Sequence, residues 1–232
     1  MTRDSDLFSG KSVLVTGAGR GLGREIALAV ARAGADVAGT ARTRVQIEDT
    51  IAGIEVLGCR GLALVADVTQ ELQVRTMVEQ ALAEFGQIDI LVNNAGVAEY
   101  GPFVEQEAAD WRAMIDTNLM GTLYCTHALL PSMLDRSQGL VINIASVAGI
   151  HGLPNEAVYC ASKHGVKAAA HTAIAHDPTT EVDDALMRAI DETGADLVVM
   201  ASHVPNVMDH IWPSNGGKLA EHAKCSVMVV RA

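Results

Sequence analysis

The 232-residue chain is 49% hydrophobic, which is enough apolar material for one sizeable core, and it carries a formal net charge of −11. This acidic balance disfavours binding to nucleic acid or to an acidic membrane surface, because both are polyanionic. The longest apolar runs, at residues 140–145 and 197–201, have the length of strands, so no segment is predicted to span a bilayer.

The N-terminus and the cysteine pattern predict a cytoplasmic protein with reduced thiols. The first twelve residues contain no apolar run of the kind found in secretory signals. The four cysteines are widely separated and form no CxxC pair: Cys59, Cys125, Cys160 and Cys225. Although His171 and His176 lie close together in sequence, no carboxylate or cysteine completes a ligand set around them, so no metal site is predicted.

Short β-branched runs alternate with longer stretches of helical periodicity through the first 170 residues. Strands are predicted at residues 12–16, 36–40, 62–67, 90–93 and 140–146. Helices are predicted at residues 21–32, 43–57, 71–85, 108–136 and 157–169, with a bend or break in the fourth at Pro131. The alternation predicts an α/β fold with a doubly wound parallel sheet, a Rossmann-like architecture.

The pattern continues after residue 170. It predicts a helix near residues 181–193, a strand at 196–202, a helix near 214–223 and a last strand at 226–231. Residues 171–175 form either a short strand or the end of the preceding helix, which would then stop before Pro178. A strand there keeps every crossover parallel and right-handed, which mildly favours it.

Residues 16–23 read TGAGRGLG and come directly after the first predicted strand. Glycines at Gly17, Gly21 and Gly23 allow a tight turn and a close approach of the backbone to a ligand. The following helix offers unpaired N–H groups and the positive end of its dipole, which suit a pyrophosphate. The segment predicts a dinucleotide-binding turn.

Further motifs occur in order along the chain. Asn94, Ala95 and Gly96 belong to an NNAG motif at the end of the fourth strand, Ser146 ends the fifth, and residues 159–163 read YCASK. Together with the glycine turn, these motifs resemble the short-chain dehydrogenase/reductase family over residues 7–168, the dinucleotide-binding and catalytic part. The resemblance implies a nicotinamide-dependent oxidoreductase and a catalytic tetrad of Asn118, Ser146, Tyr159 and Lys163.

The spacing of Tyr159 and Lys163 agrees with this role. Residues four apart share one face of a helix, and a nearby ammonium favours the ionised form of a phenol. We therefore expect a lowered pKa for Tyr159, which would exchange a proton with the substrate oxygen. Ser146 would hydrogen-bond the same oxygen, Lys163 would hold the nicotinamide ribose, and Asn118 would anchor a proton-relay water.

The cofactor preference is predicted from the end of the second strand. NAD sites usually place an acidic residue there to bind the ribose hydroxyls, whereas this chain has Ala41 followed by Arg42. Arg42, with Arg20, suits a 2′-phosphate, so NADP(H) is the predicted cofactor. The full predicted set of cofactor-binding residues is Gly17, Arg20, Gly21, Leu22, Gly23, Arg42, Asp67, Val68, Asn94, Ala95, Gly96, Tyr159 and Lys163.

The resemblance to dehydrogenases ends near residue 168, where a family member would continue to a strand with a Pro-Gly turn and a substrate loop. Residues 171–232 instead resemble the C-terminal half of a universal stress protein, so the chain has the character of a chimera. Because the apolar strand at residues 196–202 needs burial on both faces, we expect a stress-protein-like βαβ extension of one continuous sheet and a single domain over residues 1–232.

Three functions follow from these observations. The first is NADP(H)-dependent interconversion of a small carbonyl substrate and its alcohol, and the second is a dinucleotide-binding chimera with little or no activity. The third is an ATP-linked stress-type protein, which is disfavoured because Ala201, Val204 and Pro213 replace the glycines of such a phosphate loop. We also expect a homo-oligomer: the dehydrogenase resemblance implies pairing through the fourth and fifth helices and the stress-protein resemblance pairing through the last strand, and the liability of an exposed apolar edge favours a dimer through the last strand.

Overall fold

The computed structural model of the chain describes residues 7–169, 197–202 and 226–231. It divides into two compact units, Met1–Ala169 and Ala170–Ala232, and each is described by itself. The helices expected near residues 181–193 and 214–223, and the choice between strand and helix at 171–175, lie outside the described residues.

The first unit is built on a five-stranded parallel sheet with the strand order β3-β2-β1-β4-β5. Its strands are β1 (Ser12–Thr16), β2 (Asp36–Ala41), β3 (Gly61–Val65), β4 (Ile90–Asn93) and β5 (Leu140–Asn143). The strand order reverses between β1 and β4, because β2 and β3 lie on one side of β1 and the later strands lie on the other. In open α/β sheets ligands bind beyond the carboxyl ends of the strands at this switch point.

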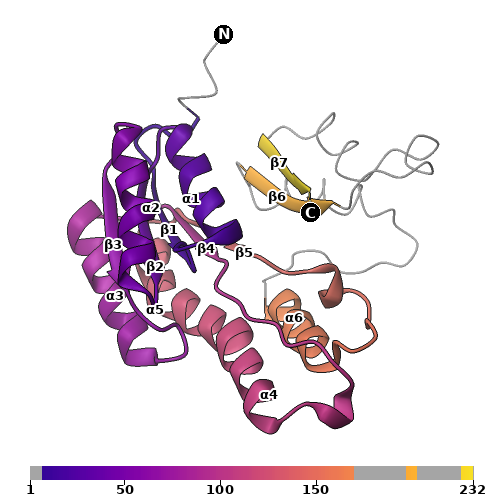
Figure 1. The fold of residues 1–232 in the computed structure, drawn as a ribbon. Helices are drawn as coiled ribbons and strands as arrows, with labels where there is room; N and C mark the ends of the chain where they lie inside the picture. Colours follow the sequence, from indigo (N-terminus) through magenta and orange to yellow (C-terminus); the bar gives the residue numbers. More distant parts are fainter. Residues whose placement is uncertain (1–6, 170–196, 203–225, 232) are drawn as a thin grey trace, which may run out of the picture. The chain divides into compact units, whose positions relative to one another are not determined.

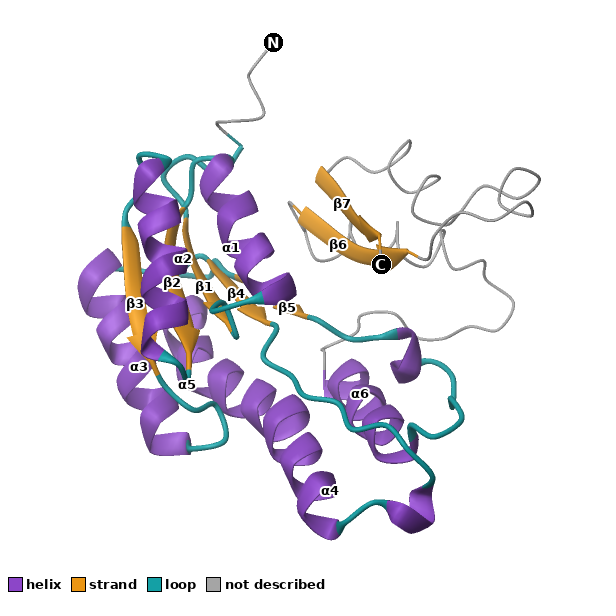
Figure 2. Cartoon of the chain, in the orientation of Figure 1, coloured by secondary structure: helices purple, strands orange, loops and turns teal. Residues whose placement is uncertain are grey.

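Helices cover both faces of this sheet (Figures 1 and 2). Helices α1 (Gly21–Arg32) and α2 (Arg44–Val56) pack on each other and on β1, β2 and β3. On the other face, α3 (Glu71–Phe85) packs on α5 (Gly121–Asp135). Two further helices, α4 (Ala108–Met114) and α6 (Ala157–Ala169), contact each other. The predicted doubly wound Rossmann-like fold is therefore confirmed for this unit.

The long helix expected at residues 108–136 is present as α4, a π-helical segment at Ile115–Met120, and α5. The helix does not break at Pro131, because α5 continues through this residue to Asp135, and the alternative of a bend there stays a prediction. Pro131 is exposed, and its ring removes only one backbone donor from the helix. The irregularity lies instead in the π segment, which carries Asn118.

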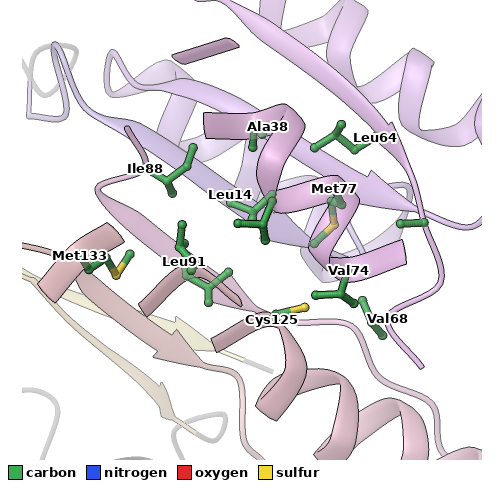
Figure 3. Close-up of a cluster of buried hydrophobic side chains, with 14 residues drawn as sticks. Leu14, Ala38, Leu64, Val68, Val74, Met77, Ile88, Leu91, Cys125 and Met133 are labelled. Carbon is green, nitrogen blue, oxygen red and sulfur yellow. The ribbon is translucent and has the colours of Figure 1, made fainter. Parts of the chain in front are cut away.

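A cluster of buried side chains joins the sheet to α3 and α5 (Figure 3). Leu14 and Leu91, on the adjacent strands β1 and β4, are fully buried in this cluster. Every residue of β1 is buried, as expected for a central parallel strand that is covered on both faces. The cluster thus fixes the positions of β1 and β4, the strands that flank the switch point.

The second unit contains the two predicted strands, β6 (Leu197–Ser202) and β7 (Ser226–Arg231). They pair in parallel, from Leu197 opposite Ser226 to Ser202 opposite Arg231, and form a sheet of their own. The predicted continuation of the first sheet into these strands stays a prediction. The apolar sequence of β6 indicates that the strand needs a neighbour but does not specify which one, and here β7 supplies it. None of the helices within the described ranges has the length and apolarity needed to cross a membrane.

The central position of Leu91 yields a test of the fold. We expect Leu91→Ala to lower the free energy of unfolding by about 3 kcal/mol, because it leaves a cavity beneath α3 and α5. Urea titration followed by circular dichroism measures the change. Leu72→Ala, at an exposed position of α3, is the control and should change stability by less than about 0.5 kcal/mol. Equal losses in the two variants would contradict the described core.

Candidate active site

The turn between β1 and α1 brings two backbone segments into contact at the switch point. Gly17 has a φ of +67°, and a Cβ atom there would lie 2.9 Å from the Cα atom of Ala95. A Cβ on Gly23 would overlap the Gly17 carbonyl oxygen and the side-chain amide of Asn94. Because only glycine leaves this space, the turn can lie directly against the segment that follows β4.

Thr16 and Asn94 hold these two segments together. The Thr16 hydroxyl oxygen accepts hydrogen bonds from the backbone N–H groups of Asn94 and Ala95, each 3.0 Å long. In return, the Asn94 side-chain amide donates to the Thr16 carbonyl oxygen at 2.9 Å. Thr16 was not among the predicted site residues. Its signal was a polar residue at the last position of a buried strand.

A cavity of about 520 Å³ opens beyond this junction. Eleven of the predicted cofactor-binding residues line it: Gly17, Arg20, Gly21, Leu22, Gly23, Arg42, Asp67, Val68, Asn94, Ala95 and Gly96. The structure also places here residues that were not predicted to bind the cofactor: Gly19, Thr40, Ala41, Thr43, Gln46, Ala66, Val97 and Thr117. Among them, the buried hydroxyl oxygen of Thr40 has no hydrogen-bond partner within the described residues.

Charged side chains mark one region of the cavity wall. Arg20, Arg42 and Asp67 are the charged residues that line it. Thr43 also lines the cavity as the N-cap residue of α2, and its side chain makes no capping hydrogen bond. The first backbone N–H groups of α2 therefore have no side-chain cap, and these groups and Arg42 both favour an anion at this part of the cavity.

Asn118 connects the segment after β4 to α6. Its side chain is almost fully buried and exchanges two hydrogen bonds with the backbone of Val97, at 2.8 and 2.9 Å. The same amide group donates to the Ser162 hydroxyl at 2.9 Å, and that hydroxyl donates to the Tyr159 carbonyl oxygen at 2.7 Å. Both amide hydrogens are used on protein groups, so the Asn118 side chain positions α6 in this structure, and its expected role in anchoring a proton-relay water stays a prediction.

Ser146, Tyr159 and Lys163 come together beside this connection. The predicted fifth strand was too long at its end: β5 stops at Asn143, and Ser146 instead caps the 3₁₀ turn Val147–Gly149. The Ser146 oxygen accepts a hydrogen bond from the Ala148 N–H at 3.1 Å, and its side chain is also hydrogen-bonded to Tyr159. The Lys163 ammonium lies 5.9 Å from the centre of the Tyr159 ring.

The expected lowering of the Tyr159 pKa is wrong for this structure. Burial raises the pKa of Tyr159 above its usual value, and the hydrogen bond with Ser146 lowers it only in part. Burial also lowers the pKa of Lys163, whose ammonium donates to the Ile144 carbonyl oxygen at 2.8 Å. Spacing along a helix placed the two residues on one face, but it could not show how deeply they are buried or which oxygen the ammonium contacts.

Comparison with known proteins gives a consistent result. The sequence profile of the short chain dehydrogenase family matches residues 11–182. The 3-oxoacyl-(acyl-carrier-protein) reductase FabG of Staphylococcus epidermidis is 38% identical over 157 residues, which are 67% of this chain and 64% of that protein. The ketoacyl reductase HetN of Nostoc is 39% identical over 159 residues, 68% of this chain and 55% of that protein. The chain therefore spans less than two thirds of the length of these relatives.

Two solved structures are also similar. One, assigned as a short-chain alcohol dehydrogenase from Sinorhizobium meliloti, has a TM-score of 0.71 and 29% identity, covering 98% of this chain and 96% of its own. The other is a short chain dehydrogenase/reductase from Burkholderia phymatum in complex with NAD, with a TM-score of 0.70 and 28% identity over 85% of this chain and 67% of its own. The family profile continues past the predicted junction near residue 168, and the stress-protein resemblance gains no support from these matches.

The burial of Tyr159 predicts that its hydroxyl ionises at a higher pH than an exposed tyrosine. In the cofactor-free protein we expect this tyrosine to lose its proton above the usual pKa of about 10, because the half-buried ring disfavours the phenolate. The ultraviolet absorbance of phenolate, titrated in the wild type and in Tyr159→Phe, isolates this transition by difference. Tyr124→Phe is the control for removal of a tyrosine outside the site. If the absorbance change that is present in the wild type and missing from Tyr159→Phe occurred below the usual tyrosine pKa, the described burial of Tyr159 would be contradicted.

Proposed function

Because the chain belongs to the short-chain dehydrogenase/reductase family, we propose that it is an oxidoreductase that interconverts a small carbonyl substrate and its alcohol with NADP(H). One observation carries the proposal. The Lys163 ammonium lies 3.7 Å from the position that a Cβ atom on Gly96 would occupy, and Gly96 lines the cavity. The group of Ser146, Tyr159 and Lys163 is thereby joined to a cavity whose residues suit a dinucleotide.

The cavity residues fit such a cofactor by their shape and chemistry. At the start of α1 the residue Arg20 makes no side-chain cap, so the first N–H groups of this helix are available to a pyrophosphate. Gly21 has a φ of +55° and open space where a side chain would project. We assign Asp67 and Val68 to the adenine, and Asn94, Ala95, Gly96 and Lys163 to the nicotinamide nucleoside.

When bound, the nicotinamide supplies or accepts the hydride, and this chain's residues handle the proton. In the direction of reduction, the Tyr159 hydroxyl donates its proton to the substrate oxygen. The raised pKa keeps that proton in place at neutral pH. In the direction of oxidation, the phenolate of Tyr159 accepts a proton from the alcohol, so this direction should become faster as the pH rises.

Ser146 and Asn118 support this transfer in different ways. The Ser146 oxygen already accepts a hydrogen bond from Ala148, so its orientation is set and its own hydrogen can be donated to the substrate oxygen. Asn118 fixes the backbone of α6 at Tyr159 through Ser162. In this assignment Ser146 and Tyr159 contact the substrate, and Asn118 positions them.

The preference for NADP(H) over NAD(H) rests on the residues after β2. Arg42, Thr43 and the start of α2 form a region of the cavity that suits a 2′-phosphate. Other nearby arginines are already paired with acids: Arg24 with Asp49 and Arg44 with Glu48, each at 3.3 Å. Since the similar structure from Burkholderia phymatum holds NAD, this preference is a separate proposal with its own test.

A second candidate function is dinucleotide binding with little or no turnover. The sequence after residue 169 favours it, because no Pro-Gly turn follows the Tyr159 helix where family members place the substrate loop. Binding of NADPH without reduction of any compound in a broad carbonyl panel would support this candidate. The stress-protein resemblance of residues 171–232, self-association through β7 and a cytoplasmic location all stay predictions, and ATP affinity tests the first of them.

Replacement of the proposed proton donor tests the enzymatic function. We expect Tyr159→Phe to lower kcat/KM for carbonyl reduction by about 100- to 10,000-fold, because the phenyl ring has no proton to give. The affinity for NADPH, measured by fluorescence titration, should change little, because the ring is kept. Tyr124→Phe, outside the site, serves as the control. Equal turnover in the wild type and Tyr159→Phe would contradict the proposed chemistry.

The proposed phosphate site is tested by a pair of arginine variants. We expect Arg42→Ala to weaken NADPH binding by about 10- to 100-fold, because a charge-assisted hydrogen bond to the 2′-phosphate is lost. The affinity for NADH, which lacks this phosphate, should stay the same. Arg44→Ala removes a neighbouring arginine that is paired with Glu48, and should leave both affinities unchanged. If Arg42→Ala weakened NADPH and NADH equally, Arg42 would not distinguish the two cofactors.

A further inference from the structure

One aromatic side chain outside the predicted tetrad contacts Tyr159. The ring centroids of Tyr100 and Tyr159 are 6.1 Å apart, and the ring planes meet at 63°, which is an edge-to-face arrangement. Tyr100 is nevertheless 60% exposed. Much of its ring is therefore free beside the residue that is proposed to exchange a proton with the substrate.

Hydrogen bonds at Gly101, the residue after Tyr100, hold its loop in place. The Gly101 N–H donates to the Asn155 carbonyl oxygen at 3.0 Å, which ties this loop to the segment before α6. The side-chain amide of Gln106 donates to the Gly101 carbonyl oxygen at 3.3 Å. Gln106 is fixed in turn by the Trp111 indole N–H, which donates to its side-chain oxygen at 3.1 Å. The exposed ring of Tyr100 thus belongs to a braced loop.

Two residues close to Ser146 in the chain are also apolar and exposed. Val147 directly follows Ser146, and both Val147 and Ile150 are 58% exposed. Glu156 acts electrostatically on Tyr159 and helps to raise its pKa, and the same negative charge disfavours an anionic substrate. The surroundings of the two hydroxyl groups suit a neutral substrate with apolar substituents.

We propose that Tyr100 contacts the substrate and selects neutral ketones with an aromatic ring next to the carbonyl group. This inference rests on the proposed function, because it places the carbonyl oxygen at the Ser146 and Tyr159 hydroxyls. A substituent of a carbonyl held there lies within reach of the Tyr100 ring. A flat aromatic substituent gains the favourable geometry of an aromatic pair, whereas a saturated ring of similar size gains only from the burial of apolar area.

Binding without turnover tests this inference. The dissociation constants of acetophenone and of cyclohexyl methyl ketone are measured by calorimetry against the protein saturated with NADP⁺, which cannot reduce either ketone. We expect the wild type to bind acetophenone roughly two- to tenfold more tightly than the saturated analogue. Tyr100→Ala should bring this ratio to about one, and Tyr100→Phe, which keeps the ring, should retain it.

Phe103→Ala is the matched control for the loss of an aromatic residue from the same loop. Phe103 is exposed and stacks on Trp111 with a centroid distance of 4.9 Å, so its removal should leave the ratio unchanged. A wild-type ratio near one, a ratio that survives Tyr100→Ala, or a lack of binding by both ketones would overturn the inference.

Turnover of the same two ketones with NADPH separates this inference from the proposed function. A binding ratio that depends on Tyr100, without turnover, would support the contact and refute the enzymatic proposal for these substrates. If both ketones are reduced and Tyr100→Ala changes neither their binding nor their turnover, the contact is refuted and the enzymatic proposal stands.

Discussion

The contact between the glycine turn and the segment after β4 is the constraint on which the site depends. Gly17 and Gly23 leave no room for side chains, and the Thr16 hydroxyl and the Asn94 amide fill the junction with hydrogen bonds. If either segment moved outward, the N-terminus of α1 and residues 94–96 would no longer border one cavity. The apolar packing of Leu14 and Leu91 beneath them keeps the two strands in position.

A second set of hydrogen bonds connects the segment after β4 to the helix that carries Tyr159 and Lys163. Asn118 is hydrogen-bonded both to Val97, in the segment that follows β4, and to Ser162, in the helix that carries Tyr159 and Lys163. A buried amide with both hydrogens used is costly to disrupt, because each partner would lose its hydrogen bond away from solvent. The π-helical segment that carries Asn118 is where the helix between β4 and β5 departs from regular geometry to make these bonds.

The sequence predicted the features that depend on local pattern. Hydrophobic periodicity located the five strands of the sheet, and the motifs placed eleven cofactor-binding candidates around one cavity. The sequence did not predict features that depend on contacts between residues far apart along the chain. The end of β5 before Ser146 and the hydrogen bonds of Asn118 are of this kind. Tyr100 carried no motif at all, because its relation to Tyr159 exists only after residues 101 and 155 are joined.

The raised pKa of Tyr159 has different consequences for the two directions of the proposed proton transfer. A phenol with a raised pKa keeps its proton at neutral pH and is available as the donor. Tyr159 can act as a base only as the phenolate, and burial increases the free-energy cost of forming it. The hydrogen bond between Ser146 and Tyr159 offsets part of this cost. The Lys163 ammonium is engaged by the Ile144 carbonyl and is not placed against the phenol oxygen by any described contact. In this arrangement the phenol is protonated at neutral pH, which is the form that the proposed reduction uses, and the phenolate that the proposed oxidation uses forms only at higher pH.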